Sequence, residues 1–174
     1  NKASFQGKYV RTDRFIEQAA FMEWLDANER KNPPLAFAGA WTKRGRGRWF
    51  QNILPTITNP ANTAMMWLPS SDGTGKPRLF ALCEGGQPIE IDPTNLATIG
   101  NEDSFFVDKP ESFFSAHFSR CLETGEIYNH GYKLKPGPGP KEINLMKLDR
   151  HGNLLQQAST VLPFDTFVHD SCLS

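Results

Sequence analysis

Two histidines and one glutamate are the residues whose types could do chemistry together. His117 follows the apolar, strand-like run Phe113–Ala116, and His169 follows the similar run Thr166–Val168. Glu84 lies upstream, between Leu82 and the glycine pair 85–86. Imidazole is the commonest metal ligand in proteins, and a ligating imidazole usually donates its other ring N–H to a carboxylate. The three residues therefore predict half of a metal site.

The spacing of the two histidines indicates what kind of architecture could bring them together. His117 and His169 are 52 residues apart, much farther than the paired ligands of a zinc finger or of one helix face. A repeating architecture is one way to place two such distant side chains on one centre. In a β-propeller the inner strands of successive blades face a common axis, which meets that requirement.

The sequence after residue 62 predicts a meander of short strands. Apolar runs alternate there with turn residues, among them Asp92–Asn95, Glu123–Gly125 and Asp149–Asn153. Strands are expected at Ala64–Leu68, Arg78–Glu84, Pro88–Ile91, Leu96–Gly100, Phe113–Phe118, Ile127–Leu134, Glu142–Leu148 and Leu154–Thr160. Hairpins in blocks of about 50 residues favour propeller blades over a sandwich. We therefore predict an all-β fold for residues 63–174.

Residues 1–62 have a different pattern. A short strand is expected at Phe5–Arg11, followed by a helix that Asp13 caps and that ends near Pro33. The segment from Leu35 to Asn62 has weak periodicity and carries the basic run Lys43–Arg48 beside aromatic residues. A solvated loop is the first reading of this run and peripheral contact with anionic lipid the second, with nucleic-acid binding a distant third.

Composition narrows the class of protein. The 174 residues are 39% apolar, and 19 basic residues balance 19 acidic ones, so no net field favours nucleic acid or an acidic ligand. Three cysteines without CxxC spacing favour reduced thiols in an intracellular compartment. No run approaches the ~20 apolar residues of a membrane span, which favours a protein that is soluble or peripheral to a membrane. The chain starts at Asn1 and stops at Ser174 within a strand-like run, so we expect a fragment.

Several stretches, in order, resemble the carotenoid cleavage oxygenases. They are Tyr9–Asp13, Asn59–Thr63, Leu82–Gly86 with Asp92–Pro93, Phe114–His117, Thr124–Tyr132 and Val168–Asp170. The resemblance implies the early blades of a seven-bladed propeller with an N-terminal helix, and so the N-terminal part of one propeller domain. It also implies a non-haem Fe(II) held by four histidines. His117 and His169 would be the first and second of these ligands. Glu84 would not bind the metal but would orient one imidazole, with His169 as the favoured partner.

The same resemblance implies an activity and leaves alternatives open. The expected reaction is cleavage of a conjugated carbon–carbon double bond of a carotenoid or apocarotenoid by O2, with an apolar polyene as substrate and a cytoplasmic or plastid location. A stilbene-cleaving dioxygenase and a metal-free binding or scaffold propeller are the alternatives. The third and fourth ligand histidines would lie beyond Ser174, so the 174 residues alone are expected to be inactive.

Other residues near these motifs have competing readings. Glu84 could be an ordinary turn carboxylate. Asp170 could orient its neighbours or end a strand. His130 stands where the family usually has an aromatic residue and is expected only to pack, and His151 is expected to face solvent in its turn.

Overall fold

The computed structural model describes residues 7, 8, 10–12, 59, 61–70, 75–100, 105–106, 112–133, 141–163 and 168–171. The regular elements of this part of the chain are all β-strands. The predicted helix after Asp13 and the basic run Lys43–Arg48 lie outside the described residues. Residues 7, 8, 10 and 11, the described part of the predicted N-terminal strand, are not in a strand. The backbone N–H of Arg11 instead donates to the hydroxyl of Thr98 at 2.9 Å.

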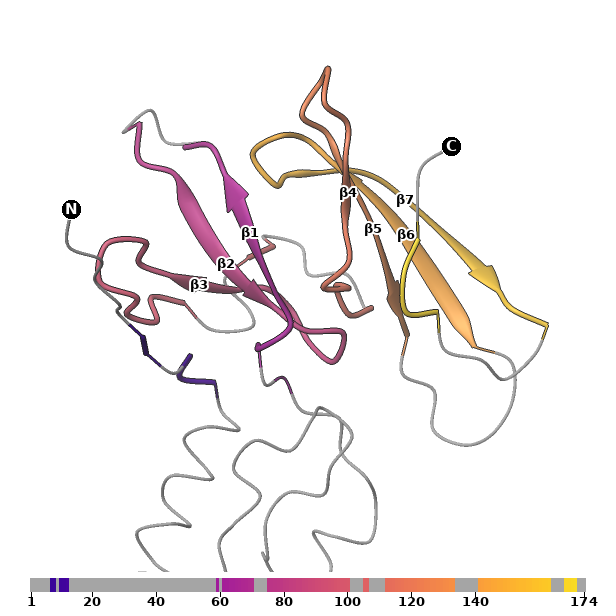
Figure 1. Ribbon diagram of the computed structural model, residues 1–174. Helices are drawn as coiled ribbons and strands as arrows, with labels where there is room; N and C mark the ends of the chain where they lie inside the picture. The colour runs from indigo at the N-terminus through magenta and orange to yellow at the C-terminus, as the bar shows by residue number, and fades with distance from the viewer. Residues whose placement is uncertain are drawn as a thin grey trace, which may run out of the picture.

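The first sheet is an antiparallel meander of three strands (Figure 1). It contains β1 (Ala64–Leu68), β2 (Arg78–Leu82) and β3 (Ile89–Ile91) in that order. Met66 and Leu68 of β1 are buried while Met65 and Trp67 are exposed, as expected for a strand with one face on a core. The strand predicted at Leu96–Gly100 is reduced to one bridge, between Thr98 and Ile91.

The second sheet is an antiparallel meander of four strands. Its order is β4 (Ser119–Arg120), β5 (Ile127–Tyr132), β6 (Glu142–Leu148) and β7 (Leu154–Val161). This is the strand arrangement of one propeller blade. The all-β prediction is confirmed for the described residues, whereas the number of blades and the domain division at residue 62 stay predictions.

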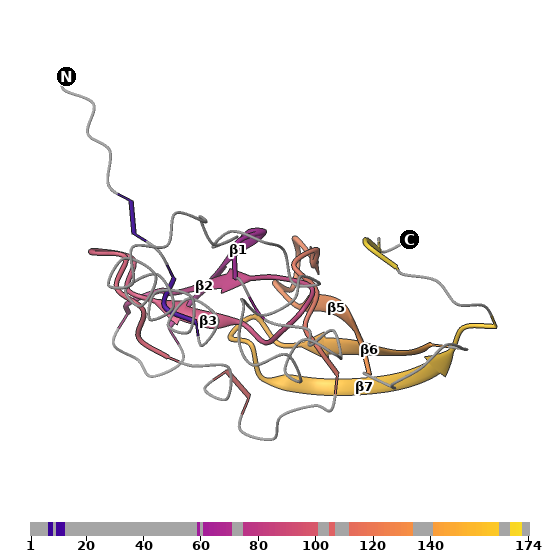
Figure 2. The ribbon, with the colours of Figure 1, turned by 90° about the horizontal axis from the view of Figure 1, so that it is seen from below.

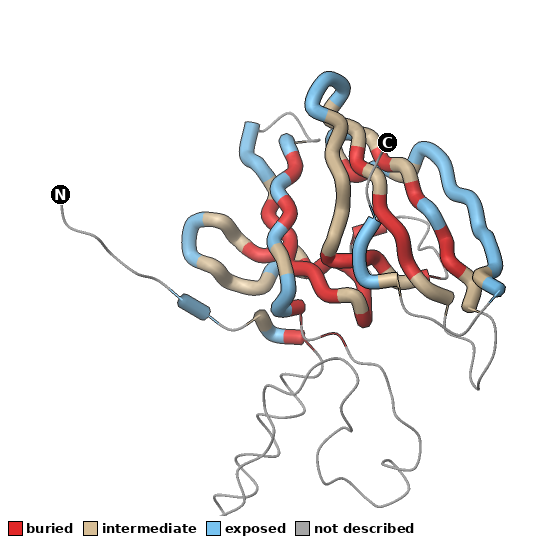
Figure 3. The backbone as a smooth tube through the Cα atoms, turned by 45° about the vertical axis from the view of Figure 1, so that its right-hand side comes forward, coloured by how far each residue is buried: buried red, intermediate tan, exposed pale blue. Residues whose placement is uncertain are grey.

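The two sheets lie beside each other and share one apolar core (Figure 1). Figure 2 shows the same neighbours from below. Phe105 has its ring centroid 4.8 Å from that of Phe80 of the first sheet and 5.7 Å from that of Phe114. The buried members of the core are Met66, Leu68, Phe80, Leu82, Phe105, Phe106, Phe114, Ala116, Ile127, Met146 and Leu148. The common core fixes the position of one sheet relative to the other. In Figure 3 both sheets contain buried stretches, drawn in red.

The segment that leads to His117 differs from its prediction. We predicted a strand over Phe113–Phe118, but the strand there is only β4, which starts at Ser119. Phe113 and Ser115 donate backbone hydrogen bonds to Tyr132 and His130 of β5 at 3.0 and 2.9 Å. Beyond these bonds, side chains bond the backbone instead: Asn129 bonds the N–H and the carbonyl of Ser115, and the Ser115 hydroxyl accepts from His117 N. His117 and His169 both lie outside strands, whereas we expected both to lie on inner strands of the propeller.

Candidate metal centre

Glu84 is placed by a tight turn directly after β2. The turn is closed by a hydrogen bond from Gly86 N to Cys83 O at 3.4 Å. Asn59 covers it: its side-chain amide donates to Gln87 O at 2.8 Å, and its Oδ1 accepts from Ala61 N at 3.0 Å. A Cβ on Gly86 would overlap the Asn59 side chain, so a glycine is needed for this close approach. The glycine at position 86 therefore lets Asn59 hold the turn.

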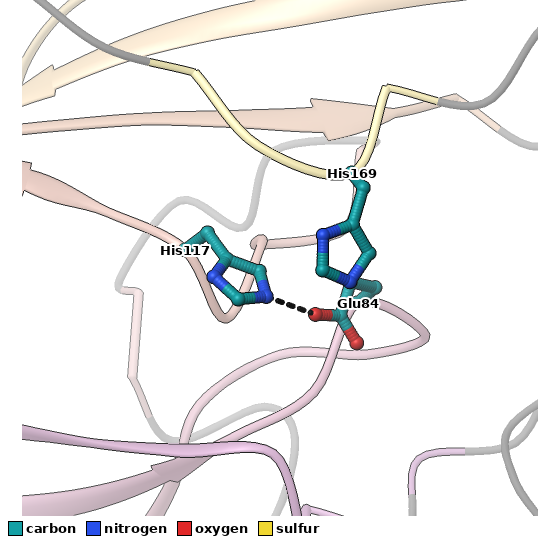
Figure 4. A group of neighbouring side chains, drawn as sticks. All are labelled: Glu84, His117 and His169. Atoms are coloured by element: carbon teal, nitrogen blue, oxygen red, sulfur yellow. Dashed lines mark ion pairs between the residues drawn. The ribbon is translucent and has the colours of Figure 1, made fainter.

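The two carboxylate oxygens of Glu84 have different surroundings. Oε2 accepts from the Thr63 hydroxyl at 3.4 Å and lies 3.7 Å from the Cys83 thiol. Burial raises the pKa of Cys83, so the thiol stays protonated and can act as a weak donor. Oε1 points instead toward the histidines, as Figure 4 shows. Thr63 and Cys83 thus fix one oxygen and direct the other.

His117 is positioned by a set of side-chain-to-backbone hydrogen bonds from β5. The Asn129 amide holds Ser115 on both sides: Oδ1 accepts from Ser115 N at 2.9 Å and Nδ2 donates to Ser115 O at 2.8 Å. The Ser115 hydroxyl then accepts from His117 N at 3.0 Å. Asn129 and Ser115 are both buried, so these bonds are shielded from water. The polar core of β5 therefore sets the backbone of His117.

The structure brings all three predicted site residues together. His117 Nε2 lies 3.2 Å from Glu84 Oε1, and the rings of His117 and His169 have centroids 4.3 Å apart with an angle of 46° between their planes. One potential ligand atom from each residue lies within 4.8 Å of the others. Figure 4 shows the three side chains converging from separate segments. We expected His169 to be the partner of Glu84, but the 3.2 Å contact is between Glu84 and His117.

Two of these atoms are buried without a hydrogen-bond partner. His117 Nε2 and Glu84 Oε1 are shielded from solvent and, although 3.2 Å apart, are not aligned for a hydrogen bond. Unsatisfied buried polar atoms are costly and rare. Atoms bound at ~2.1 Å to one metal lie up to ~4.2 Å apart, so small side-chain movements would bring the three atoms to that span. Two imidazoles with a carboxylate beside them, which can bind the metal or support an imidazole, fit a divalent transition metal.

Among the described residues, His130, His151 and Cys121 do not belong to this group of possible ligands. His130 is buried on β5, and His151 lies in the turn before β7, where its Nε2 accepts from Arg150 Nε at 3.0 Å. Cys83 and Cys121 are free thiols, while Cys172 lies outside the described residues.

We did not assign Thr63, Cys83 or Asn129 to the site from the sequence. All three lie within stretches that resemble the carotenoid cleavage oxygenases, and this is the signal that could have pointed to them. In the described part of the chain, no helix is long and apolar enough to cross a membrane.

Comparison with known proteins supports the resemblance noted in the sequence. An apocarotenoid-15,15'-oxygenase of Synechocystis is 28% identical over 99% of this chain and 32% of its own length. A resveratrol cleavage oxygenase of Aspergillus fumigatus is 27% identical over 97% of this chain and 29% of its own length. The chain thus spans about a third of these relatives.

Solved structures give the same picture. The crystal structure of cobalt-substituted apocarotenoid oxygenase (ACO) of Synechocystis matches with a TM-score of 0.62 and 28% identity, over 94% of this chain and 31% of that one. The family described as retinal pigment epithelial membrane protein matches residues 1–174. The chain therefore belongs to this family of carotenoid oxygenases.

Proposed function

We propose that the complete protein containing this chain is a non-haem Fe(II) dioxygenase. It would cleave a conjugated carbon–carbon double bond of a carotenoid or apocarotenoid, with His117 and His169 as two of four histidine ligands. The observation that carries the proposal is the convergence of Glu84, His117 and His169, with two of their polar atoms buried and lacking a hydrogen-bond partner. A buried polar atom without a partner costs stability, and a metal bound at this group would give His117 Nε2 a partner, which supports the proposal.

The residues of this chain would prepare the site rather than transfer protons. Ferrous iron, when bound, would supply the activation of O2. His117 and His169, as neutral imidazoles, would hold the metal without cancelling its charge. Glu84 would orient an imidazole and select its tautomer, while Thr63 and Cys83 keep its other oxygen in place. One O2 adds one oxygen atom to each carbon of the broken double bond, so two carbonyl products account for all atoms.

A stilbene is the second candidate substrate, because relatives named resveratrol cleavage oxygenase match 97% and 99% of this chain. The two substrates can be separated by one assay. The complete protein, loaded with Fe(II), would be given an apocarotenoid or resveratrol in air, and product carbonyls and O2 consumption would be measured. We expect faster loss of the polyene absorption band than of the stilbene band.

The same assay tests the metal centre. His117→Ala and His169→Ala should each abolish cleavage and metal retention, because each removes one neutral ligand. His151→Ala, at a histidine that lies in a turn away from the group, should leave both unchanged. A folded wild-type protein that retains no metal would reject the proposal in favour of a scaffold.

A further inference from the structure

His130 connects β5 to both sides of the segment that carries His169. Its side chain is 2% exposed. His130 Nε2 lies 3.2 Å from the carbonyl oxygen of Val168, and Nδ1 lies 2.9 Å from the hydroxyl of Ser171. These two residues flank His169 and Asp170 in the sequence. One buried imidazole therefore contacts the backbone just before the candidate ligand and a side chain just after it.

The chemistry of the partners determines the form of the His130 ring. The Val168 carbonyl can only accept a hydrogen bond, so Nε2 must carry the proton. A neutral ring then leaves Nδ1 as the acceptor for the Ser171 hydroxyl. Burial lowers the pKa of His130, which favours this neutral ring. Both nitrogens are thus satisfied by the segment of His169, and a purely apolar side chain could make neither contact.

Asn129, the neighbour of His130 on β5, holds the segment that carries His117. Asn129 holds the backbone of Ser115, two residues before His117, as described above. A further link joins the two ligand segments, because the Ser119 hydroxyl donates to Ser171 O at 3.3 Å. Adjacent residues of one strand therefore hold the two histidine segments, so the separation of the imidazoles depends on β5.

We propose that His130 is a positioning residue that fixes His169 for metal binding through its bonds to Val168 and Ser171. This inference rests on the proposed function of the Glu84–His117–His169 group and extends it. His130 does not touch the metal; it limits the movement of a segment whose four described residues contain no strand and whose ligand side chain is exposed. A ligand held in place before binding loses less conformational freedom when the metal binds.

The test uses the complete protein, with Co(II) as the metal probe because its visible spectrum reports ligand geometry. His130→Phe keeps a large side chain but removes both hydrogen bonds, and His130→Gln can keep a donor and an acceptor. Ser171→Ala removes one partner at an exposed position, where misfolding is not expected. His151→Phe is the matched control, since it makes the same replacement in the turn before β7. Co(II) affinity, the d–d spectrum and thermal unfolding would be measured for each variant.

We expect His130→Phe to weaken Co(II) binding about tenfold, near the lower limit for residues that support a ligand, and to change the d–d spectrum. His130→Gln should restore most of the affinity, and Ser171→Ala should shift the spectrum in the same direction by less. The inference is wrong if the wild type and His151→Phe bind Co(II) while folded His130→Phe gives the same spectrum and affinity. If the wild type itself binds no Co(II), the proposed metal centre fails and this inference fails with it.

Discussion

At the scale of single residues, the candidate metal centre depends on the different partners of the two carboxylate oxygens of Glu84. Thr63 and Cys83 occupy Oε2, while Oε1 is buried beside His117. An amide in place of the carboxylate would present a donor to one of these two sides instead of an acceptor to both. Replacing Glu84 can therefore show whether it supports an imidazole or binds the metal directly, because the two roles predict metal-affinity losses of different size.

Glu84→Gln in the complete protein should lower Fe(II) or Co(II) affinity about 10–100-fold, as is typical of carboxylates that orient ligands. The measurement is competition against a chelator of known affinity. Glu123→Gln, at an exposed position in the turn before β5, is the control and should have no effect. A loss as complete as that of His117→Ala would make Glu84 a direct ligand, and an unchanged affinity would assign it to the turn alone.

The two described cysteines should differ in reactivity. Burial raises the pKa of Cys83, whereas hydrogen bonding from Thr124 lowers the pKa of Cys121. The thiolate is the reactive form, so at a pH of about 7.5 iodoacetamide should modify Cys121 first. The ordinary pKa of a cysteine thiol is 9.0, so modification of Cys83 should need a pH above 9.0 or unfolding of the protein. Peptide mass mapping over time measures both rates, and faster labelling of Cys83 would contradict its burial against Glu84.

At the scale of elements, β5 is the strand on which the site depends. The segment from Phe113 lies so close to β5 that a Cβ on Gly131 would overlap the Phe113 carbonyl group. Gly131→Ala should therefore displace the backbone that leads to His117 and destabilise the protein by ~1–3 kcal/mol, as overpacking does. The measurement is thermal unfolding of the complete protein together with Co(II) affinity.

Gly75→Ala is a useful contrast to Gly131→Ala. Gly75 has a φ of 71°, but a Cβ at this position would have no other atom within 4 Å, so only backbone strain opposes the replacement. We expect ~1 kcal/mol of destabilisation there and unchanged Co(II) affinity. Equal Co(II) affinity in Gly131→Ala and Gly75→Ala would show that close packing on β5 does not control the centre.

The sequence predicted elements correctly where contacts between nearby residues determine them, and wrongly where distant residues do. β6 was predicted over its observed bounds and β7 to within one residue, because both flank a turn that local hydrogen bonds of Asp149 stabilise. The strand predicted at Phe113–Phe118 was wrong because the side chain of Asn129, 14 residues away, bonds the Ser115 carbonyl and shares its N–H, so the backbone pairing with β5 does not continue as a strand. No local pattern shows such a competitor.

The candidate site follows the same rule. Sequence motifs selected Glu84, His117 and His169, which the structure brings together. They did not select the supporting role of His130, because its contacts are to Val168 and Ser171, 38 and 41 residues later. An isolated histidine between Asn129 and Gly131 has no spacing that indicates such partners. Residues that bind a metal carry a chemical signature, whereas residues that hold them depend on the fold.

At the scale of the molecule, β7 is the exposed edge of the second sheet. It pairs with β6 on one side, and seven of its eight residues are exposed, including Leu155 and Val161 at 55% and 57%. A long edge strand with unpaired backbone groups and apolar side chains is a site for association. The 174-residue chain, expressed alone, should therefore form oligomers or aggregates, which light scattering coupled to size-exclusion chromatography would detect.

A charged edge should reverse that behaviour without changing the fold. Lysine on an edge strand opposes strand pairing, so the double variant Leu155→Lys and Val161→Lys should shift the 174-residue chain toward monomer. Leu122→Lys is the control, because Leu122 is 97% exposed but lies in the turn between β4 and β5. It adds charge and removes an exposed apolar side chain without altering an edge, so it should leave association largely unchanged. Equal effects of the two replacements would assign association to general surface hydrophobicity, and a monomeric wild-type chain would show that the β7 edge needs no partner.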